Sequence, residues 1–157
     1  MKNKFKVWFH FTLFVGSIIF TVGCKKQDPL PIDAFKAEIS TLNAPAAIKA
    51  KSEAFIKVKV KNASRYFWSA STSKDSVNSI FIAYHWLDNR GNMLVKSGRV
   101  TSLPADLETG QEVVFDAKIL APDTPGQYIL EFDMLQHCVS WFGDKGSKTT
   151  LLNIQIN

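Results

Sequence analysis

Beyond its first 33 residues, the chain alternates apolar and polar positions with a period of two in almost every segment. This period is typical of half-buried β-strands, because successive side chains of a strand point to opposite faces of the sheet. No segment there shows a convincing helical period. We therefore predict an all-β protein. The alternation recurs in six stretches, and their apolar positions are Phe35/Ala37/Ile39, Ala54/Ile56/Val58/Val60, Ile80/Ile82/Tyr84/Trp86, Val113/Phe115/Ala117/Ile119, Tyr128/Leu130/Phe132/Met134 and Leu152/Ile154/Ile156.

Turn residues separate these stretches at regular intervals. Residues 88–92 read Asp-Asn-Arg-Gly-Asn and predict a hairpin connection, because Asn and Gly tolerate positive φ. Residues 122–126 and 143–146 carry further Pro, Gly and Asp turn signals, and the serine-rich segment 69–79 predicts a mobile loop. Short strands with this punctuation favour a β-sandwich.

The first 26 residues have a different pattern. Lys2, Lys4 and Lys6 precede an apolar run from Val7 to Val22, which ends at Gly23-Cys24. A basic start, a short apolar run and small residues before a cleavage point are typical of a secretory signal. The alternative is a transmembrane anchor, but sixteen residues are fewer than the about 20 that span a bilayer.

The Thr21-Val22-Gly23-Cys24 segment resembles the lipobox of bacterial lipoproteins, with Thr21 in place of the usual aliphatic residue. The resemblance implies cleavage after Gly23, diacylation of Cys24 and a membrane-anchored mature protein. Two acyl chains are enough for stable anchoring. Lys25 and Lys26 lack the aspartate associated with inner-membrane retention in enterobacterial lipoproteins, which favours the outer membrane. We expect a signal peptide at 1–23, a lipidated tether at 24–33 and one domain at 34–157.

Charge excludes one class of partner. The whole chain has a formal net charge of +5, but three of its basic residues lie in the signal. The mature chain then has sixteen basic and fourteen acidic residues, which is not the basic surface that nucleic-acid binding requires. Lys57, Lys59 and Lys61 alternate along one predicted strand, and we interpret them as its solvated face.

The chain has two cysteines. Because the lipid would occupy Cys24, Cys138 is left with no partner for an intrachain disulfide. Its neighbours are apolar, and we predict a buried, inert thiol.

The segment 50–156 resembles bacterial immunoglobulin-like accessory domains, which occur on envelope proteins and beside enzymes that act on polysaccharides. The Pro-Gly-Gln-Tyr run at 125–128 looks like the start of strand F in such sandwiches, with Tyr128 as the corner tyrosine that bonds back to upstream backbone. The resemblance implies an immunoglobulin-like antiparallel β-sandwich of about seven to nine strands. Such domains bind glycans or proteins, or act as spacers. The other matching pieces are 60–64 with Trp68, 84–86 with Asp88 and Gly91, Leu103-Pro104 with Gly110, Ala121-Pro122, and Trp141-Phe142 with Gly146.

Neither catalysis nor a metal site finds support in the sequence. His137 and Cys138 are neighbours, which point to opposite faces of a strand and cannot form a catalytic dyad. Pairing of the strands that hold His85 and His137 would separate the two rings by about 13–20 Å, too far for one zinc site. We expect no enzyme, no cofactor and no metal. The same pairing predicts a structural contact between His85 and Asp133 on the outer face of the sheet.

Aromatic side chains are the better functional candidates, because sugar rings present apolar faces with polar rims. Our candidate ligand contacts are Trp68, Trp141, Phe142, His85 and Arg99. Two alternatives stay open: Trp68 could fill the core, as we expect for Trp86, and Arg99 could be an exposed structural charge. The function we expect is carbohydrate binding by an envelope lipoprotein. The alternative is a protein-interaction or structural subunit of an envelope complex.

Overall fold

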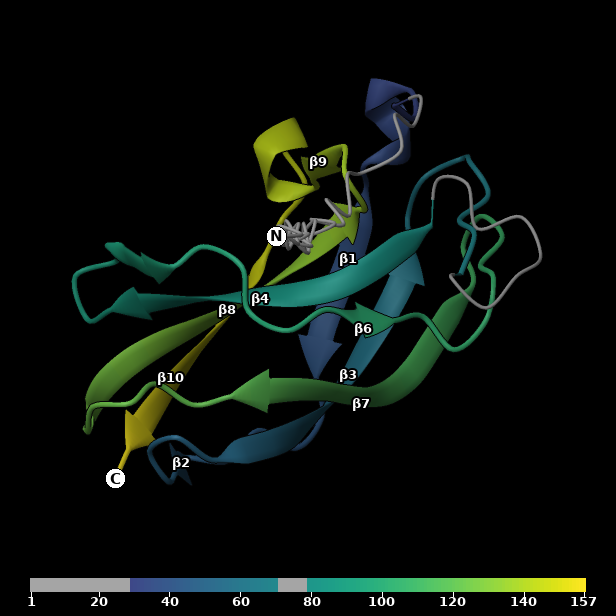
Figure 1. Cartoon of the computed structure of the whole chain (residues 1–157). Helices are drawn as coiled ribbons and strands as arrows, with labels where there is room; N and C mark the ends of the chain where they lie inside the picture. The colour runs from purple at the N-terminus through teal and green to yellow at the C-terminus, as the bar shows by residue number, and fades with distance from the viewer. Residues whose placement is uncertain (1–28, 71–78) are drawn as a thin grey trace, which may run out of the picture.

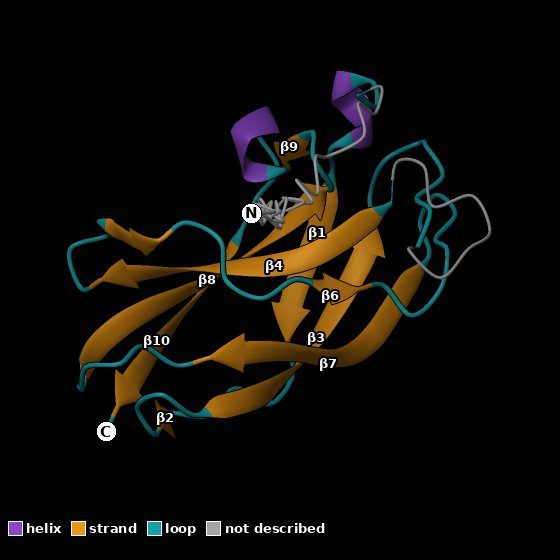
Figure 2. Ribbon diagram, in the orientation of Figure 1, coloured by secondary structure: helices purple, strands orange, loops and turns teal. Residues whose placement is uncertain are grey.

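A computed structural model describes residues 29–70 and 79–157 of the chain. Almost all regular structure in these residues is β-strand, arranged in two facing sheets with two short 3₁₀ turns (Figure 1; Figure 2). The elements are η1 Ile32–Ala34, β1 Ala37–Thr41, β2 Ala47–Ile48, β3 Glu53–Asn62, β4 Ile80–Asp88, β5 Met93–Val95, β6 Thr101–Ser102, β7 Glu112–Leu120, β8 Gly126–Gln136, β9 Ser140–Trp141, η2 Gly143–Lys145 and β10 Thr150–Ile156.

The smaller sheet has the order β1-β3-β7, and the larger has the order β2-β10-β8-β4-β5, with β6 on β4 and β9 on β8. All pairs are antiparallel except β2 and β10, which pair in parallel. The predicted antiparallel β-sandwich is therefore confirmed apart from this one pair. The described residues hold ten strands rather than seven to nine, because β2, β5, β6 and β9 are only two or three residues long.

The core lies between the sheets and is built from the predicted apolar positions. In β4 the residues Ile80, Ile82, Tyr84 and Trp86 are all buried, as the alternation predicts. The largest fully buried side chains also include Ile56, Ile119, Leu130, Phe132 and Met134. Each full burial of such a side chain contributes about 1.5–3 kcal/mol, so this interior supplies the main driving force for folding.

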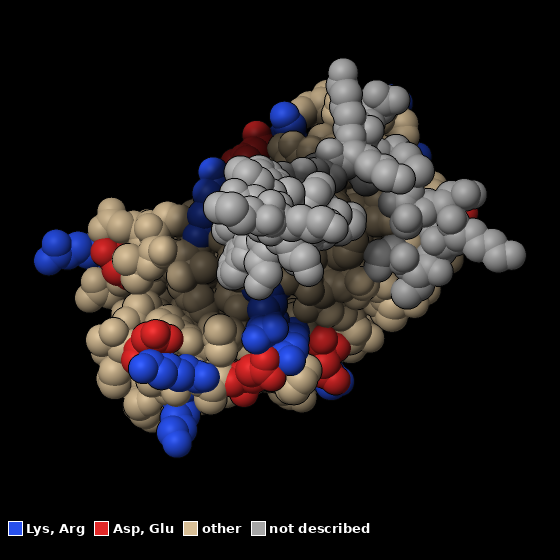
Figure 3. Space-filling view, viewed as in Figure 1, with Lys and Arg blue, Asp and Glu red and all other residues tan. Residues whose placement is uncertain are grey.

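The outer face of the smaller sheet is a ladder of opposite charges. Lys57 pairs with Asp116 at 3.0 Å, Lys59 with Glu112 at 3.5 Å, and Lys61 with Glu38 at 3.2 Å. Basic and acidic side chains lie next to one another on the visible face (Figure 3). The interpretation of these lysines as a solvated strand face is confirmed.

Tyr128 forms the predicted corner. Its hydroxyl donates to the carbonyl of Thr124 at 3.0 Å, and its ring packs edge-on against Trp86. Trp86 is buried and its indole Nε1 donates to the carbonyl of Leu120 at 2.9 Å. Two facing sheets with a tyrosine corner make this an immunoglobulin-like sandwich, and both residues have the structural roles we predicted.

The predicted signal peptide, the lipobox with Cys24 and the tip of the serine-rich loop at 71–78 lie outside the described residues. The last part of the expected tether differs from an extended linker, because it packs on the domain. Leu30 donates its amide to Gln136, and Asp33 pairs with Arg65 at 2.5 Å. Within the described ranges, no helix is long and apolar enough to cross a membrane.

Candidate functional site

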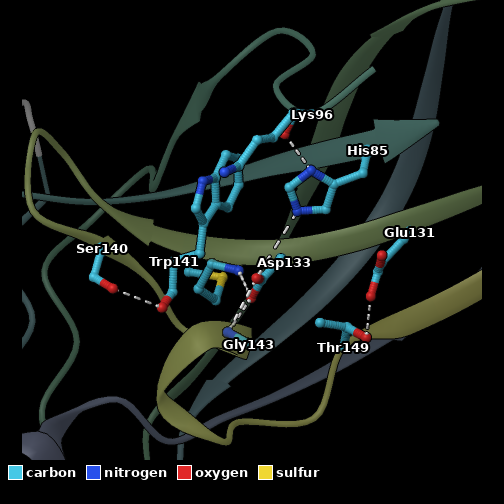
Figure 4. A network of polar contacts seen from close by, with 9 residues as sticks. His85, Lys96, Glu131, Asp133, Ser140, Trp141, Gly143 and Thr149 are labelled. Carbon is cyan, nitrogen blue, oxygen red and sulfur yellow. Dashed lines mark hydrogen bonds and ion pairs between the residues drawn. The ribbon is translucent and has the colours of Figure 1, made fainter. Parts of the chain in front are cut away.

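A polar hollow of about 280 Å³ lies on the outer face of the larger sheet, under the β9–η2 segment. We call it the His85 pocket, after the residue at its floor (Figure 4). Its lining side chains come from β4, β5, β8, β9 and the segments around them: His85, Met93, Lys96, Glu131, Asp133, Trp141, Gly143, Asp144, Ser147 and Thr149.

Strand register brings the polar residues of the pocket together. His85 on β4 lies directly opposite Glu131 on β8, and Asp133 is its diagonal neighbour. The His85 Nε2 and Asp133 Oδ2 atoms are 4.0 Å apart. The predicted His85–Asp133 contact is thus confirmed. It lies on the outer face of the larger sheet, as predicted, but the β9–η2 segment covers it, so that both side chains are more than nine-tenths buried.

Trp141 covers His85. The hairpin from β8 to β9 returns the chain across the sheet, and places the Trp141 ring 4.3 Å from the His85 ring, centroid to centroid. Trp141 itself is half-buried, so one part of its ring surface faces solvent at the pocket. Of the aromatic candidates from the sequence, Trp141 is the one at a pocket that also contains His85.

Asp133 fixes the turn that follows Trp141. Its carboxylate accepts hydrogen bonds from the amides of Met134 at 2.7 Å and Gly143 at 3.0 Å. A Cβ at position 143 would lie 2.8 Å from Asp133 Oδ2, so glycine permits this close approach. The buried carboxylate therefore positions η2 and the ring of Trp141 above the pocket floor.

His85 lies in a negative environment. Its Nδ1 contacts the carbonyl oxygen of Lys96, which fixes the orientation of the ring. Burial of the ring acts to lower the pKa of His85. The contacts with Asp133 and the Lys96 carbonyl and the charge of Glu131 outweigh burial, and the pKa lies above its ordinary value.

The polar lining also includes four residues that the sequence analysis did not propose for the site: Glu131, Asp144, Lys96 and Thr149. The Thr149 hydroxyl donates to Glu131 Oε1 at 2.6 Å. Asp144 on η2 and the Lys96 side chain are exposed at the rim. Glu131 could have been found from the strand register that places it opposite His85. The other three residues lie in or next to turns, and the periodicity of strands does not predict where turns place their side chains.

Trp68 and Phe142 do not reach this site. Both are fully buried, and their rings pack edge-to-face at 5.2 Å, while Phe35 packs edge-on against Phe142 at 5.0 Å. The Trp68 Nε1 donates to the carbonyl of Ala34 inside the domain. Their assignment as ligand contacts is wrong, because a ring with no exposed surface offers nothing to a ligand.

Arg99 lies on another part of the molecule. It pairs with Glu53 at 2.9 Å and borders a groove of about 540 Å³. Tyr84 and Trp86 form the floor of this groove, and Leu120 lies at its side. The ion pair favours the alternative of a structural charge for Arg99.

Cys138 differs from its prediction. It lies in the turn between β8 and β9, where it is exposed and has a φ of 57°. It is disulfide-bonded. The predicted buried free thiol is therefore wrong: the chain reverses direction here, and the turn holds the side chain out of the core.

In the part of the chain that the structure describes, no group of three or more His, Cys, Asp or Glu residues has a geometry that could hold a metal ion. His137 lies away from the pocket, with its ring 5.5 Å from that of Phe81.

No family model and no curated protein matches the chain. Among solved structures, a β-glucosidase from Listeria innocua in complex with gluconolactone has 11% identity and a TM-score of 0.46 over 78% of this chain, which spans 16% of that enzyme. A CARDB domain from Pyrococcus furiosus, in complex with di-metal ions, has 12% identity and a TM-score of 0.44, covering 78% of this chain and 86% of that one. A sporulation control protein from Bacillus subtilis has 13% identity and a TM-score of 0.44, covering 78% of this chain and 49% of that one. Likenesses this weak say nothing of the ligand or activity of this chain.

Proposed function

We propose that this chain is a non-catalytic envelope lipoprotein whose sandwich binds carbohydrate at the His85 pocket. The observation that carries the proposal is the arrangement of a half-exposed Trp141 beside three carboxylates. An indole ring provides a flat apolar surface for the C–H face of a sugar, and Glu131, Asp133 and Asp144 accept hydrogen bonds from its hydroxyl groups.

A binding role suits this pocket better than catalysis. The Asp133 carboxylate is held by two backbone amides, and the His85 ring is held by the Lys96 carbonyl and covered by Trp141. These groups are fixed by structural contacts, and the two hydroxyl side chains of the lining are engaged as well: Ser147 bonds to the backbone of Ala37, and Thr149 donates to Glu131. Preorganised acceptors of this kind favour recognition of a ligand.

The membrane anchor is part of the same proposal. It rests on the resemblance of residues 21–24 to a lipobox, with Cys24 as the lipidated residue, and on the absence of an aspartate after it, which favours the outer membrane.

A screen of glycans tests the binding proposal. The full chain in detergent micelles should bind an envelope polysaccharide or a defined glycan, with a change in tryptophan fluorescence. Trp141→Ala should lose the binding, whereas Phe55→Ala should retain it. Phe55 is a suitable control because it is an exposed aromatic residue on the outer face of the other sheet. If both variants lose binding equally, or if both retain it, the His85 pocket is not the binding site.

One observation favours a protein partner as the second candidate. The strand β5 forms an edge of the larger sheet, and its three residues Met93, Leu94 and Val95 are 48%, 54% and 39% exposed. An exposed apolar edge can pair with a strand of another protein. In that case Leu94→Lys should abolish co-purification of a crosslinked partner, and added glycans should have no effect on it.

A further inference from the structure

The His85 pocket has an excess of hydrogen-bond acceptors. Glu131, Asp133 and Asp144 contribute carboxylates, and Lys96 is the one lysine or arginine among the lining residues. The Thr149 hydroxyl and the Gly143 amide already donate to these carboxylates. A ligand that fits the pocket must therefore bring donors, and positive charge is favoured over negative.

The floor of the pocket contains two hydrogen-bond acceptors, His85 Nε2 and Asp133 Oδ2, with no donor from the described residues between them. With Nδ1–H directed at the Lys96 carbonyl, the neutral His85 ring presents Nε2 as an acceptor. Asp133 Oδ2 is 4.0 Å away, beyond the distance of a good hydrogen bond, and both side chains are more than nine-tenths buried. A group with at least two N–H donors could bond to both atoms at once.

The ring of Trp141 also favours the binding of a positively charged group. Its ring lies over His85 at the wall of the pocket. The face of an indole attracts a cation, and this attraction is larger where water is partly excluded.

We infer that the ligand of the His85 pocket carries a protonated amino group, and that the carbohydrate it selects is one with a free, unacetylated amine. This inference rests on the proposed carbohydrate binding and specifies its ligand class. The ammonium group donates to His85 Nε2, Asp133 and Glu131, and the sugar ring lies against Trp141.

Protonation of His85 competes with this ligand. An added proton on Nε2 turns that acceptor into a donor toward Asp133 and removes the site for the amine. The charged groups that line the pocket around the ring are Glu131 and Asp133 from β8, Asp144 from η2 and Lys96 from the segment after β5. A bound ammonium group should therefore lower the pKa of His85, since it adds a positive charge beside the ring.

The test compares three β-1,4-linked tetramers, of glucosamine, N-acetylglucosamine and glucose, by calorimetry with the full chain in detergent micelles at neutral pH. We expect the glucosamine tetramer to bind at least about tenfold more tightly than the other two, because a charge-assisted hydrogen bond is lost in both. An NMR titration should show a lower pKa of His85 in the complex with the glucosamine tetramer, and not in the complexes with the other two.

Two variants test whether the His85 pocket is responsible for the preference for the amine. Glu131→Gln removes one charge at the half-buried wall of the pocket and should abolish the preference for the amine. Glu112→Gln makes the same chemical change on the other sheet, where Glu112 pairs with Lys59, and should leave the preference unchanged.

The outcomes distinguish this inference from the function on which it rests. Equal binding of the three tetramers, or a preference for the acetylated one, overturns the inference and leaves carbohydrate binding in place. No binding of any tetramer to a folded protein contradicts both. A preference for the amine that Glu112→Gln loses and Glu131→Gln keeps would place amine recognition outside the His85 pocket and overturn the inference.

Discussion

His85 is a buried histidine that the fold holds beside two carboxylates, and this makes the stability of the domain depend on pH. The pKa of His85 is raised in the folded state, so its contribution to stability is complete below the ordinary pKa of about 6.5. It is lost as the pH rises through the folded value. Glu131 and Asp133 supply the negative charge that raises this pKa.

We expect the free energy of unfolding of the wild type to fall relative to that of His85→Gln between pH 6 and pH 8. Urea unfolding at a series of pH values measures the difference. A difference between the two proteins that stays constant, or grows in favour of the wild type as the pH rises, would contradict the raised pKa.

Tyr128 gives a second test at a single side chain. Tyr128→Phe removes the hydrogen bond to the Thr124 carbonyl and keeps the ring on Trp86, so it should cost about 1 kcal/mol of unfolding free energy. Tyr66→Phe is the matched control, because the Tyr66 hydroxyl has only a 3.4 Å contact from the Arg65 guanidinium at the surface. An equal effect of the two substitutions would show that the corner bond contributes no stability.

Single residues also show where sequence reasoning ends. Trp86 could be placed in the core because it has the same parity as Ile80, Ile82 and Tyr84 in one long strand. Trp68 and Phe142 lie outside any strand long enough to show a period. Phe142 packs against Phe35, which is far away in the sequence, and Trp68 packs against Phe142. Composition and spacing carry no information on that contact.

The segment after β5 links the pocket to the core. Gly98 donates its amide to the Tyr84 carbonyl at 2.8 Å, and a Cβ at this position would lie 2.1 Å from the Tyr84 ring. Two residues earlier, the Lys96 carbonyl contacts His85. The conformation of this segment therefore determines both the groove and the orientation of the histidine.

Gly98→Ala should force the segment away from β4, with a cost of about 1–3 kcal/mol in unfolding free energy. Loss of the Lys96 contact should also lower the pKa of His85 measured by NMR. Ser97→Ala, one residue earlier at an exposed position, should change neither quantity. An unchanged stability of Gly98→Ala would mean that Tyr84 moves aside at no cost.

Strands of five residues or more were predictable, and shorter ones were not. The six alternating stretches correspond to β1, β3, β4, β7, β8 and β10, because each has at least three side chains on its buried face. The strands β2, β5, β6 and β9 have two or three residues, too few to show a period. Since β9 and η2 form the roof of the His85 pocket, the sequence could predict its floor but not its closure.

The molecule as a whole is proposed to be tethered to a membrane by one residue. Cys24→Ser should block lipid attachment and leave an unprocessed precursor, detected by mass spectrometry and by partition into detergent. A Cys24→Ser protein that is cleaved normally and released would contradict the lipoprotein assignment.

The central claim is that carbohydrate binds at the His85 pocket, and the tryptophans of the domain allow a direct test. The full chain with ¹⁵N-labelled indole groups is titrated with a glycan that binds it, and the signals of Trp68, Trp86 and Trp141 are followed by NMR. Trp68 lies in the core and Trp86 lines the groove beside Arg99, so each reports on a different location. We predict a saturable shift of the Trp141 signal while the other two stay constant. A shift of Trp86 with Trp141 unchanged would place the ligand in the groove and contradict the account.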